Sequence, residues 1–273
     1  MMRDDVFIVS RRRPGEPDDQ LRARHLADVR EFFQLLRKEG VRLKPSKLHL
    51  AVPASEPLEV LGYIVQDHTM RKRPKDVEAI LGFPEPKTRT ELRRFLGAVE
   101  WVRRFSMNLA KTEGPLVDAG KMPEDIRQEN TVRRAQGRKM RDDWHLSLSP
   151  EARASFEATK AAIAEMILLS EFSSDDATWA TYVALDAGGG ALGAVLLQRR
   201  RAGPPDWRII ACHSRRMTPA ELNYIPTEQE LLAIYFAVKH WEEYLEGRVV
   251  TIFSDHEPLE YMNRQVTQHS KSN

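Results

Sequence analysis

The spacing of apolar residues in the first half of the chain predicts helices separated by short strands. Apolar side chains recur three and four positions apart over residues 20–39, the repeat of an amphipathic helix, and Gly40 stands where such a helix commonly ends. Runs of β-branched and aromatic residues predict strands over residues 6–10 and 58–65. Residues 74–82 begin with a proline and predict a further short helix.

A helix start is predicted at Thr88, because Thr88 and Glu91 have the spacing of a capping box. In that motif the threonine hydroxyl accepts a hydrogen bond from the backbone of residue 91, and the glutamate reaches back to the helix start. A helical wheel separates an apolar face from a second face that carries Arg93, Gly97, Trp101 and Arg104. A tryptophan on this second face either packs on a neighbouring element or contacts a ligand, and these residues alone favour neither.

The pattern changes in the second half, where strand-like runs dominate. Residues 121–143 are polar and charged, and they predict a linker or an exposed helix between two domains. After a helix that begins near Ser149, strands are predicted over residues 178–187, 191–198, 207–213 and 249–254, with one long helix over 227–245. Glycines 188–190 suit a tight hairpin, and the helix lets the fourth strand return parallel. The predicted order is β-β-β-α-β, an α/β fold with a mixed sheet.

Three acidic residues of the second half are candidates for chemistry. Asp186 ends an apolar strand before the glycine turn, Glu230 lies on the inner side of the long helix, and Asp255 follows the last strand. Taken singly, an aspartate at a strand end is usually a turn residue that bonds its own backbone. Taken together, with no cysteine or histidine at ligand spacing, the three describe an oxygen-rich site suited to Mg²⁺ or Mn²⁺.

Composition narrows the class of protein. The chain has 273 residues, of which 41% are hydrophobic, as expected for one large or two modest globular domains. The single cysteine, Cys212, excludes a disulfide scaffold. No apolar run reaches the about 18 residues of a membrane span, and the N-terminus lacks an apolar signal segment. We therefore expect an intracellular protein with no membrane partner.

Charge is divided unevenly along the chain. Residues 1–145 hold 30 Lys and Arg against 23 Asp and Glu, whereas residues 146–273 hold 12 against 17. A basic half followed by an acidic half is typical of a chain in which one part meets a polyanion and the other concentrates carboxylates. Basic stretches are more often solvated surfaces, so charge alone does not predict nucleic-acid binding.

Short motifs follow one another along the second half of the chain, namely Asp186-Ala187, LGAVLLQ at 192–198, Ser214-Arg215, ELLAI at 230–234 and SDHEPL at 254–259. In this order they resemble the ribonuclease H domain of gypsy-type LTR-retrotransposon Pol polyproteins. Upstream, Leu61-Gly62-Tyr63 resembles a primer-grip hairpin, and motifs within residues 83–116 resemble the thumb of the same reverse transcriptases. Residues 2–10 are similar to the polymerase strand that carries paired metal-binding aspartates.

The resemblance implies an α+β thumb region followed by an RNase H-like mixed sheet. The implied domains are the end of the palm with its hairpin over residues 1–67 and a thumb-like helical region over 68–120. A charged linker over 121–143 and the RNase H-like domain over 144–273 follow. Further polymerase groups and the fourth nuclease acid are expected outside this sequence. We therefore expect an incomplete polymerase site and a C-terminally truncated nuclease.

The resemblance also implies roles for single residues. Asp186, Glu230 and Asp255 match three of the four acids that hold two Mg²⁺ ions in the nuclease. Asp4 and Asp5 match the metal-binding pair of the polymerase. In the thumb of these reverse transcriptases, certain residues follow a template-primer duplex or an RNA/DNA hybrid, and the arginines among them contact phosphates. The matching residues here are Arg93, Gly97, Trp101 and Arg104.

Three functional hypotheses follow from these residues. The first is a reverse transcriptase/RNase H enzyme that hydrolyses RNA in RNA/DNA hybrids with Mg²⁺. The second is a catalytically inactive nucleic-acid-binding remnant of a retroelement polyprotein. The third is a fragment of a decayed element with no stable product. Other segments of the same polyprotein are expected as partners, and the three acids favour the first hypothesis.

Overall fold

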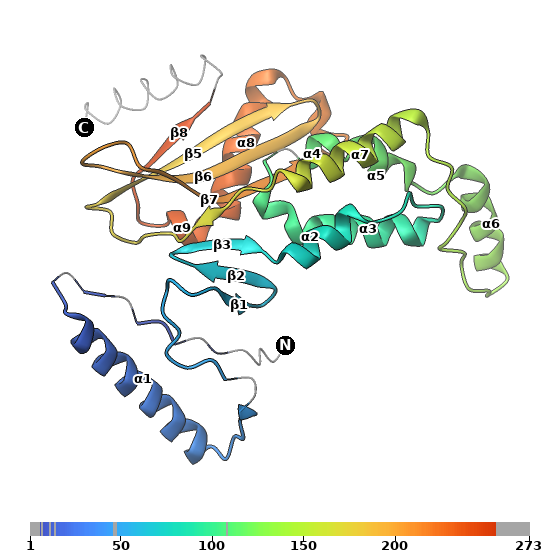
Figure 1. The fold of residues 1–273 in the computed structure, drawn as a ribbon. Helices are drawn as coiled ribbons and strands as arrows, with labels where there is room; N and C mark the ends of the chain where they lie inside the picture. The colour runs from blue at the N-terminus through green and yellow to red at the C-terminus, as the bar shows by residue number, and fades with distance from the viewer. Residues whose placement is uncertain are drawn as a thin grey trace. The chain divides into compact units, whose positions relative to one another are not determined.

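The computed structural model describes residues 6, 8–10, 12–13, 15–45, 48–107 and 109–254 (Figure 1). The chain divides into two compact units between Asp67 and His68. No helix in these described ranges is long and apolar enough to cross a membrane.

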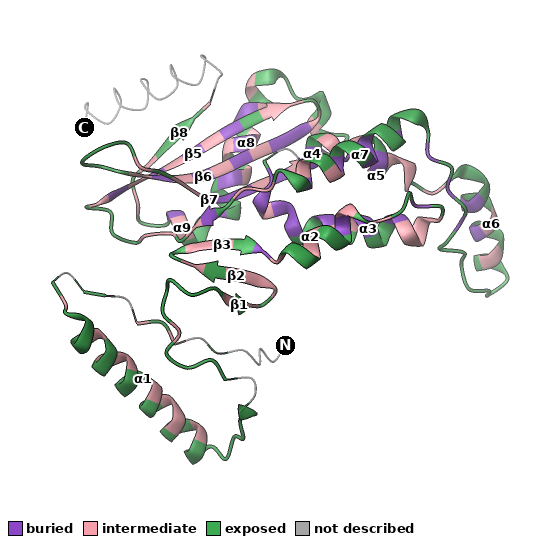
Figure 2. Cartoon of the chain, in the orientation of Figure 1, coloured by how far each residue is buried: buried purple, intermediate pink, exposed green. Residues whose placement is uncertain are grey.

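Helix α1 (Asp18–Lys38) is the long element of the first unit. It covers the stretch whose spacing predicted an amphipathic helix, so that prediction is confirmed. Acidic residues occupy its first turn and basic residues its last turn, where each sign complements the helix dipole. None of its residues is buried (Figure 2), so packing adds little to the stability of this helix.

A short hairpin is a second regular element of the first unit. Strands β1 (Leu58–Val60) and β2 (Tyr63–Gln66) pair antiparallel around Leu61 and Gly62. Both turn residues have positive φ, 49° and 81°, as in the turns that match the twist of paired strands. The single strand predicted over residues 58–65 is therefore two strands. The strand predicted over residues 6–10 does not form in its described residues, 6 and 8–10.

The second unit contains a helical layer closed by a small strand pair. Strand β3 (Thr69–Lys72) pairs antiparallel with β4 (Leu169–Ser170), which brings the two ends of the layer together. Between them lie α2 (Pro74–Leu81), α3 (Arg89–Val102), the 3₁₀ turn η2 (Arg103–Phe105), α4 (Leu109–Thr112), α5 (Gly114–Ala119), α6 (Glu124–Ala135) and α7 (Pro150–Ala164). Their apolar faces form a core that includes Phe95 and Phe156, whose ring centres lie 4.7 Å apart.

Helix α3 begins where the sequence predicts. Thr88 Oγ1 accepts a hydrogen bond from the Glu91 N–H at 3.2 Å. The Glu91 carboxylate accepts from the Lys87 N–H at 2.7 Å, one residue beyond the partner that a capping box predicts. The predicted apolar stripe is confirmed, because these members of it are buried: Leu92, Phe95, Val99 and Val102.

Helix α6 occupies much of the stretch predicted as a linker or an exposed helix. Most of its residues face solvent, but Ile126 belongs to the helical core. Asn130 exchanges two hydrogen bonds with the backbone of Arg141, at 2.8 and 2.6 Å. Trp144 and residues of α7 belong to the same core, so packing continues past residue 143. The domain boundary placed there remains a prediction.

The second layer of this unit is a four-stranded mixed sheet. The spatial order is β7 (Trp207–Arg216), β6 (Ala191–Arg200), β5 (Trp179–Gly188) and β8 (Val250–Phe253). Strand β8 is parallel to β5, and the other pairs are antiparallel. The turn η3 (Glu221–Asn223), helix α8 (Pro226–His240) and helix α9 (Glu242–Leu245) lie between β7 and β8. The predicted β-β-β-α-β order and α/β fold are confirmed.

Two local predictions differ in their outcome. The glycine hairpin forms as predicted, with Gly188 opposite Ala191 and with φ of 63° and 74° at Gly189 and Gly190. The single helix predicted over residues 227–245 is instead divided at Trp241, where α8 ends and α9 begins.

Helix α8 covers one face of the sheet. Val183 and Leu185 of β5 pack with Ala233 and Ala237 of α8 in a second core. Side chains alternate along a strand, so Asp186 projects from the opposite face of the sheet. The buried residues in Figure 2 concentrate on this sheet, on α8 and on the helical layer.

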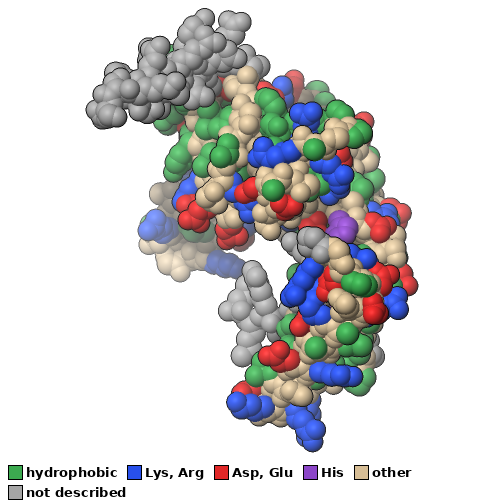
Figure 3. Space-filling model, turned by 90° about the vertical axis from the view of Figure 1, so that its left-hand side faces the viewer, with side chains coloured by type: hydrophobic (Ala, Val, Ile, Leu, Met, Phe, Trp, Pro, Cys, Tyr) green, Lys and Arg blue, Asp and Glu red, His purple; other side chains and the backbone are tan. Residues whose placement is uncertain are grey.

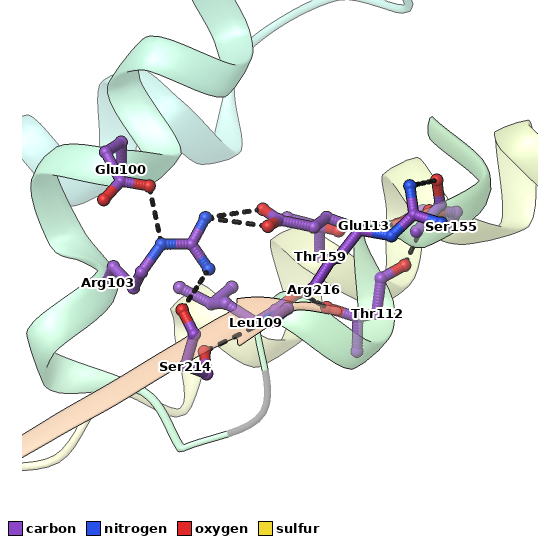
Figure 4. A network of polar contacts seen from close by, with 11 residues as sticks. Glu100, Arg103, Leu109, Thr112, Glu113, Ser155, Thr159, Ser214 and Arg216 are labelled. Carbon is purple, nitrogen blue, oxygen red and sulfur yellow. Dashed lines mark hydrogen bonds and ion pairs between the residues drawn. The ribbon is translucent and has the colours of Figure 1, made fainter. Parts of the chain in front are cut away.

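A buried ion pair joins the helical layer to the sheet (Figure 4). Arg103, 8% exposed, donates to both oxygens of Glu113, 6% exposed, at 2.8 and 2.9 Å. Arg103 also donates to Glu100 at 2.6 Å and to the carbonyl of Ser214 in β7 at 3.5 Å. Burial acts to lower the pKa of Arg103, but the neighbouring carboxylates outweigh it and raise that pKa. The guanidinium therefore stays charged.

Further hydrogen bonds extend this junction along β7 (Figure 4). The N–H of Ala110 donates to Ser214 Oγ at 3.3 Å. Arg216 donates to both oxygens of Asp118 at 2.9 and 3.1 Å, and this contact is the main cause that lowers the pKa of Asp118 to about 2. Ser155 donates from α7 to the carbonyl of Thr112 at 2.6 Å. Helices α4 and α5 are thereby fixed to β7 and to α7.

We predict that Arg103→Met destabilises the chain by about 3–5 kcal/mol, because Glu113 is left as a buried charge without its partner. The free energy of unfolding from urea denaturation measures this loss. The double variant Arg103→Met/Glu113→Met is expected to recover most of it, since replacing a whole buried pair by apolar side chains is often neutral.

The exposed pair of Arg153 and Glu85 provides a matched control, with side chains 56% and 42% exposed. Arg153→Met is expected to cost at most about 1 kcal/mol. Equal losses for the two arginine variants would contradict the structural role assigned to the buried pair.

Candidate functional site

Asp186 stands near the end of β5, beside the glycine hairpin. Its side chain is exposed, whereas the preceding residues of β5 are buried or half-buried. In register, Asp186 lies opposite Gly193 of β6, and Gly193 lies opposite Ser214 of β7. Asp186, Gly193, Ser214 and Lys111 of α4 line one pocket. The carboxylate is thus accessible in a concave surface.

Glu230 lies in the first half of α8 and is buried, with 6% of the residue exposed. Its Oε2 accepts a hydrogen bond from Ser254 Oγ at 3.0 Å, which brings Glu230 to the end of β8. The nearby Glu228 is exposed and accepts from the Ile225 N–H at 3.1 Å, so it caps the helix. Glu230 therefore lies on the inner side of α8, as the sequence predicts, and Glu228 lies on the exposed side.

The remaining predicted acids lie outside the described residues. These are Asp255 of the nuclease site, and Asp4 and Asp5 of the polymerase pair. The register of β5 and β8 is described as far as Ala184 opposite Phe253. The structure therefore brings Glu230 to the end of β8, and the assignments of Asp255, Asp4 and Asp5 remain predictions.

Asp186 and Glu230 offer carboxylate oxygens, the donors that Mg²⁺ and Mn²⁺ prefer. Within the described ranges, no group of three acidic, His or Cys side chains is placed to hold an ion. In those same ranges, Glu230 forms no ion pair, and its hydrogen-bond donor is the neutral hydroxyl of Ser254. A buried carboxylate is costly without a cation, so Glu230 fits a role as a metal ligand.

The face of α3 predicted to follow a duplex is largely open. Arg93, Gly97 and Trp101 are exposed, and Trp101 is 42% exposed. A Cβ added at Gly97 would meet no atom within 4 Å, so the glycine keeps this surface flat and open. Arg104 is half-buried, and its guanidinium carbon lies 5.9 Å from the centre of the Phe105 ring. Arg104 is therefore less accessible than the other three.

Lys72 is a residue of this face that sequence reasoning missed. It closes β3, it is 4% exposed, and its Nζ lies 3.1 Å from the centre of the Trp101 ring. Burial lowers the pKa of Lys72 to about 8. The cation therefore supports the inner face of the Trp101 ring and fixes its direction. Nothing in the polar run around Lys72 signals this contact.

Charges of both signs are mixed on one face of the molecule. On the face drawn in Figure 3, Lys and Arg side chains are interspersed with Asp and Glu and form no single basic patch. Nucleic-acid contact on this face would therefore depend on individual side chains more than on a broad positive potential.

The sequence is similar to retrotransposon polyproteins. Residues 176–273 match the RNase H-like domain found in reverse transcriptase. Over 258 residues, 94% of this chain, it is 25% identical to the Transposon Tf2-3 polyprotein of Schizosaccharomyces pombe. Over 237 residues, 86% of this chain, it is 25% identical to the Transposon Tf2-7 polyprotein of the same organism. The chain spans 17% and 16% of the lengths of these relatives.

Solved structures share the fold. The foamy viral protease-reverse transcriptase in complex with dsDNA aligns with a TM-score of 0.64 at 17% identity, over 89% of this chain and 45% of that chain. A structure of the foamy viral protease-reverse transcriptase in complex with RNA/DNA hybrid gives a TM-score of 0.64 at 18% identity, over 86% of this chain and 28% of that chain. At these identities the likeness establishes the fold.

We predict that Lys72→Met changes the alkaline stability profile. Between pH 8 and 10.5 Lys72 is protonated in the unfolded chain and deprotonated in the folded chain. The free energy of unfolding of the wild type should therefore rise with pH across this range, relative to that of the variant. The gain is about 1–3 kcal/mol, since one pKa unit corresponds to about 1.4 kcal/mol. Urea denaturation across this pH range measures it. A constant difference between the two proteins would contradict the burial of this cation.

Proposed function

We propose that this chain hydrolyses RNA in RNA/DNA hybrids, because its sequence is similar to retrotransposon polyproteins and residues 176–273 match the RNase H-like domain found in reverse transcriptase. In this proposal Asp186, Glu230 and Asp255 are the catalytic acids, and Mg²⁺ or Mn²⁺ is the cofactor. The reaction is endonucleolytic hydrolysis of a phosphodiester, and the substrate is a hybrid duplex. The surrounding polyprotein would supply further activities.

The burial of Glu230 beside the end of β8 is the observation that carries this proposal. Ser254, whose hydroxyl bonds Glu230, immediately precedes Asp255 in the sequence. Ala184 of β5 is paired in register with Phe253 of β8. Asp186 and Asp255 each follow two positions later in the sequence. Asp186 and Glu230 lie on opposite faces of the sheet, so in this proposal they meet at the shared carboxyl ends of the parallel strands β5 and β8, where active groups of α/β sheets collect.

The described acids have complementary environments for this chemistry. Together with Asp255, these acids would hold a divalent cation, which would supply Lewis acidity and activate a water for attack at neutral pH. Asp186 is exposed at the lining of a small pocket, so its carboxylate can be reached from solvent. Glu230 is buried and oriented by Ser254, which restrains its carboxylate. Contacts to the 2′-hydroxyl and to hybrid shape would select RNA in the cleaved strand.

The open face of α3 supports the binding half of the proposal. Trp101 presents its outer face to solvent while Lys72 supports its inner face. An aromatic ring held in this way can lie on the sugars of a duplex, and Gly97 allows close approach of a backbone. Arg93 and Arg104 would contact phosphates, which position a duplex without reading its sequence.

We predict that Asp186→Asn removes cleavage of an end-labelled RNA/DNA hybrid in both Mg²⁺ and Mn²⁺. The expected loss is at least about 100-fold, because changes to residues that merely orient metal ligands already cost about 10–100-fold. The fold should be unaffected, since the side chain is exposed and nearly isosteric. Addition of EDTA to the wild type should have the same effect as the substitution.

Asp206→Asn is the matched control, because Asp206 is a half-buried aspartate that precedes β7 and pairs with Arg208. This variant is expected to retain the wild-type cleavage rate. Wild-type rates for Asp186→Asn would refute the site. A folded wild-type chain that binds the hybrid without cleaving it would identify a binding remnant.

We predict that Trp101→Ala weakens binding of the RNA/DNA hybrid on the order of tenfold, the size of an aromatic contact with nucleic acid. Fluorescence anisotropy of a labelled hybrid measures the Kd. Trp207→Ala removes a tryptophan of similar exposure, 45%, from β7 and should leave the Kd unchanged. A large loss of thermal stability with no change in Kd would show that Trp101 serves packing instead.

A further inference from the structure

Lys111 shares the pocket of Asp186, although it comes from a different layer of the second unit. The lysine lies in α4, which packs on β6 and β7, and both side chains line the pocket together with Ser214. A Cβ at Gly189 would lie 3.3 Å from Lys111 Cε, so the lysine stem passes directly over the glycine hairpin. Gly189 also has a φ of 63°, a conformation that favours glycine.

The position of Lys111 is fixed by its neighbours on α4. Ala110 donates its N–H to Ser214 Oγ, and Ser214 lies in register with Gly193, which lies opposite Asp186. On the other side, the Thr112 carbonyl accepts from Ser155 of α7 at 2.6 Å. The residues on both sides of Lys111 are therefore held by hydrogen bonds, and the lysine emerges from a rigid platform.

The ammonium of Lys111 remains available to a ligand. The residue is exposed, and none of its described contacts is an ion pair, with Asp186 or with any other acid. Exposed lysines elsewhere in this unit do pair, as Lys121 does with Asp118 at 2.8 Å and Lys239 with Glu242 at 2.7 Å. An unpaired cation beside an exposed carboxylate suits a ligand that carries negative charge next to a metal ion.

We propose that Lys111 binds a backbone phosphate of the hybrid beside the Asp186 site, so that the helical layer contributes directly to the nuclease site. This inference rests on the proposed function, since it places a nucleic-acid phosphate at Asp186. Lys111 acts as a point charge that anchors the strand next to the reacting phosphodiester. The contact carries no sequence information and positions the strand only.

The test measures the Kd of a labelled RNA/DNA hybrid for the full chain over a series of NaCl concentrations, with Ca²⁺ present to prevent turnover. The proteins compared are the wild type, Lys111→Met, Lys111→Arg and Lys239→Met. Lys239 lies in the last turn of α8, nine residues after Glu230, and is the control for loss of a surface lysine. Thermal midpoints of all four proteins report any loss of folding.

Each phosphate contact contributes about 0.9 to the slope of log affinity against log salt concentration. Lys111→Met is therefore expected to lower this slope by about 0.9 and to raise the Kd about three- to tenfold at low salt, whereas Lys111→Arg and Lys239→Met keep the wild-type slope. A wild-type slope for Lys111→Met, with binding otherwise intact, would overturn the role of Lys111 alone. Absence of hybrid binding by the folded wild type would overturn this inference together with the proposed function.

Discussion

The buried ion pair between Arg103 and Glu113 is the interaction on which the arrangement of the second unit depends. Removing two charges from water costs several kcal/mol for each ion, and the cost is met only when geometry and hydrogen bonding are good. Here both carboxylate oxygens are engaged, and the guanidinium also reaches Glu100 and the backbone of Ser214. A displacement of the helical layer against β7 would break these contacts together. The pair therefore selects one alignment of the two layers more than it adds net stability.

That alignment determines the surroundings of the candidate site. Ser214, Gly193 and Asp186 are successive partners across β7, β6 and β5, so whatever fixes β7 also fixes the floor of the pocket. Helix α4 is attached to the same point by the Ala110–Ser214 hydrogen bond. A short helix of four residues has little stability of its own, and its position must come from such contacts. The helical layer and the sheet are in this sense one support for the pocket.

Local patterns predicted the parts of this structure whose causes are local. Alternating and helical periods in the second half specify β-β-β-α-β, the glycines specify the hairpin, and Thr88 with Glu91 specifies the start of α3. The pairing of Arg103 with the Ser214 carbonyl, 111 residues away, has no local signature, and neither does Lys72 beneath Trp101. Burial of a charge depends on the partner that the fold delivers, which periodicity does not report. The division of α8 from α9 is likewise a tertiary effect, because Trp241 is buried in the sheet core.

Ion-pair partners also distinguish the structural acids from Glu230, a candidate catalytic acid. The second half of the chain holds 17 Asp and Glu, and composition alone does not distinguish among them. In the described structure Glu221 pairs with Arg215, Asp176 with Arg248 and Asp206 with Arg208, so these charges are satisfied within the fold. Glu230 is more buried than any of the three, yet the described contacts give it a serine hydroxyl in place of a cation. The attraction between charges strengthens as water is excluded. Binding of a cation would therefore stabilise the buried Glu230 carboxylate more than it would stabilise an exposed acid.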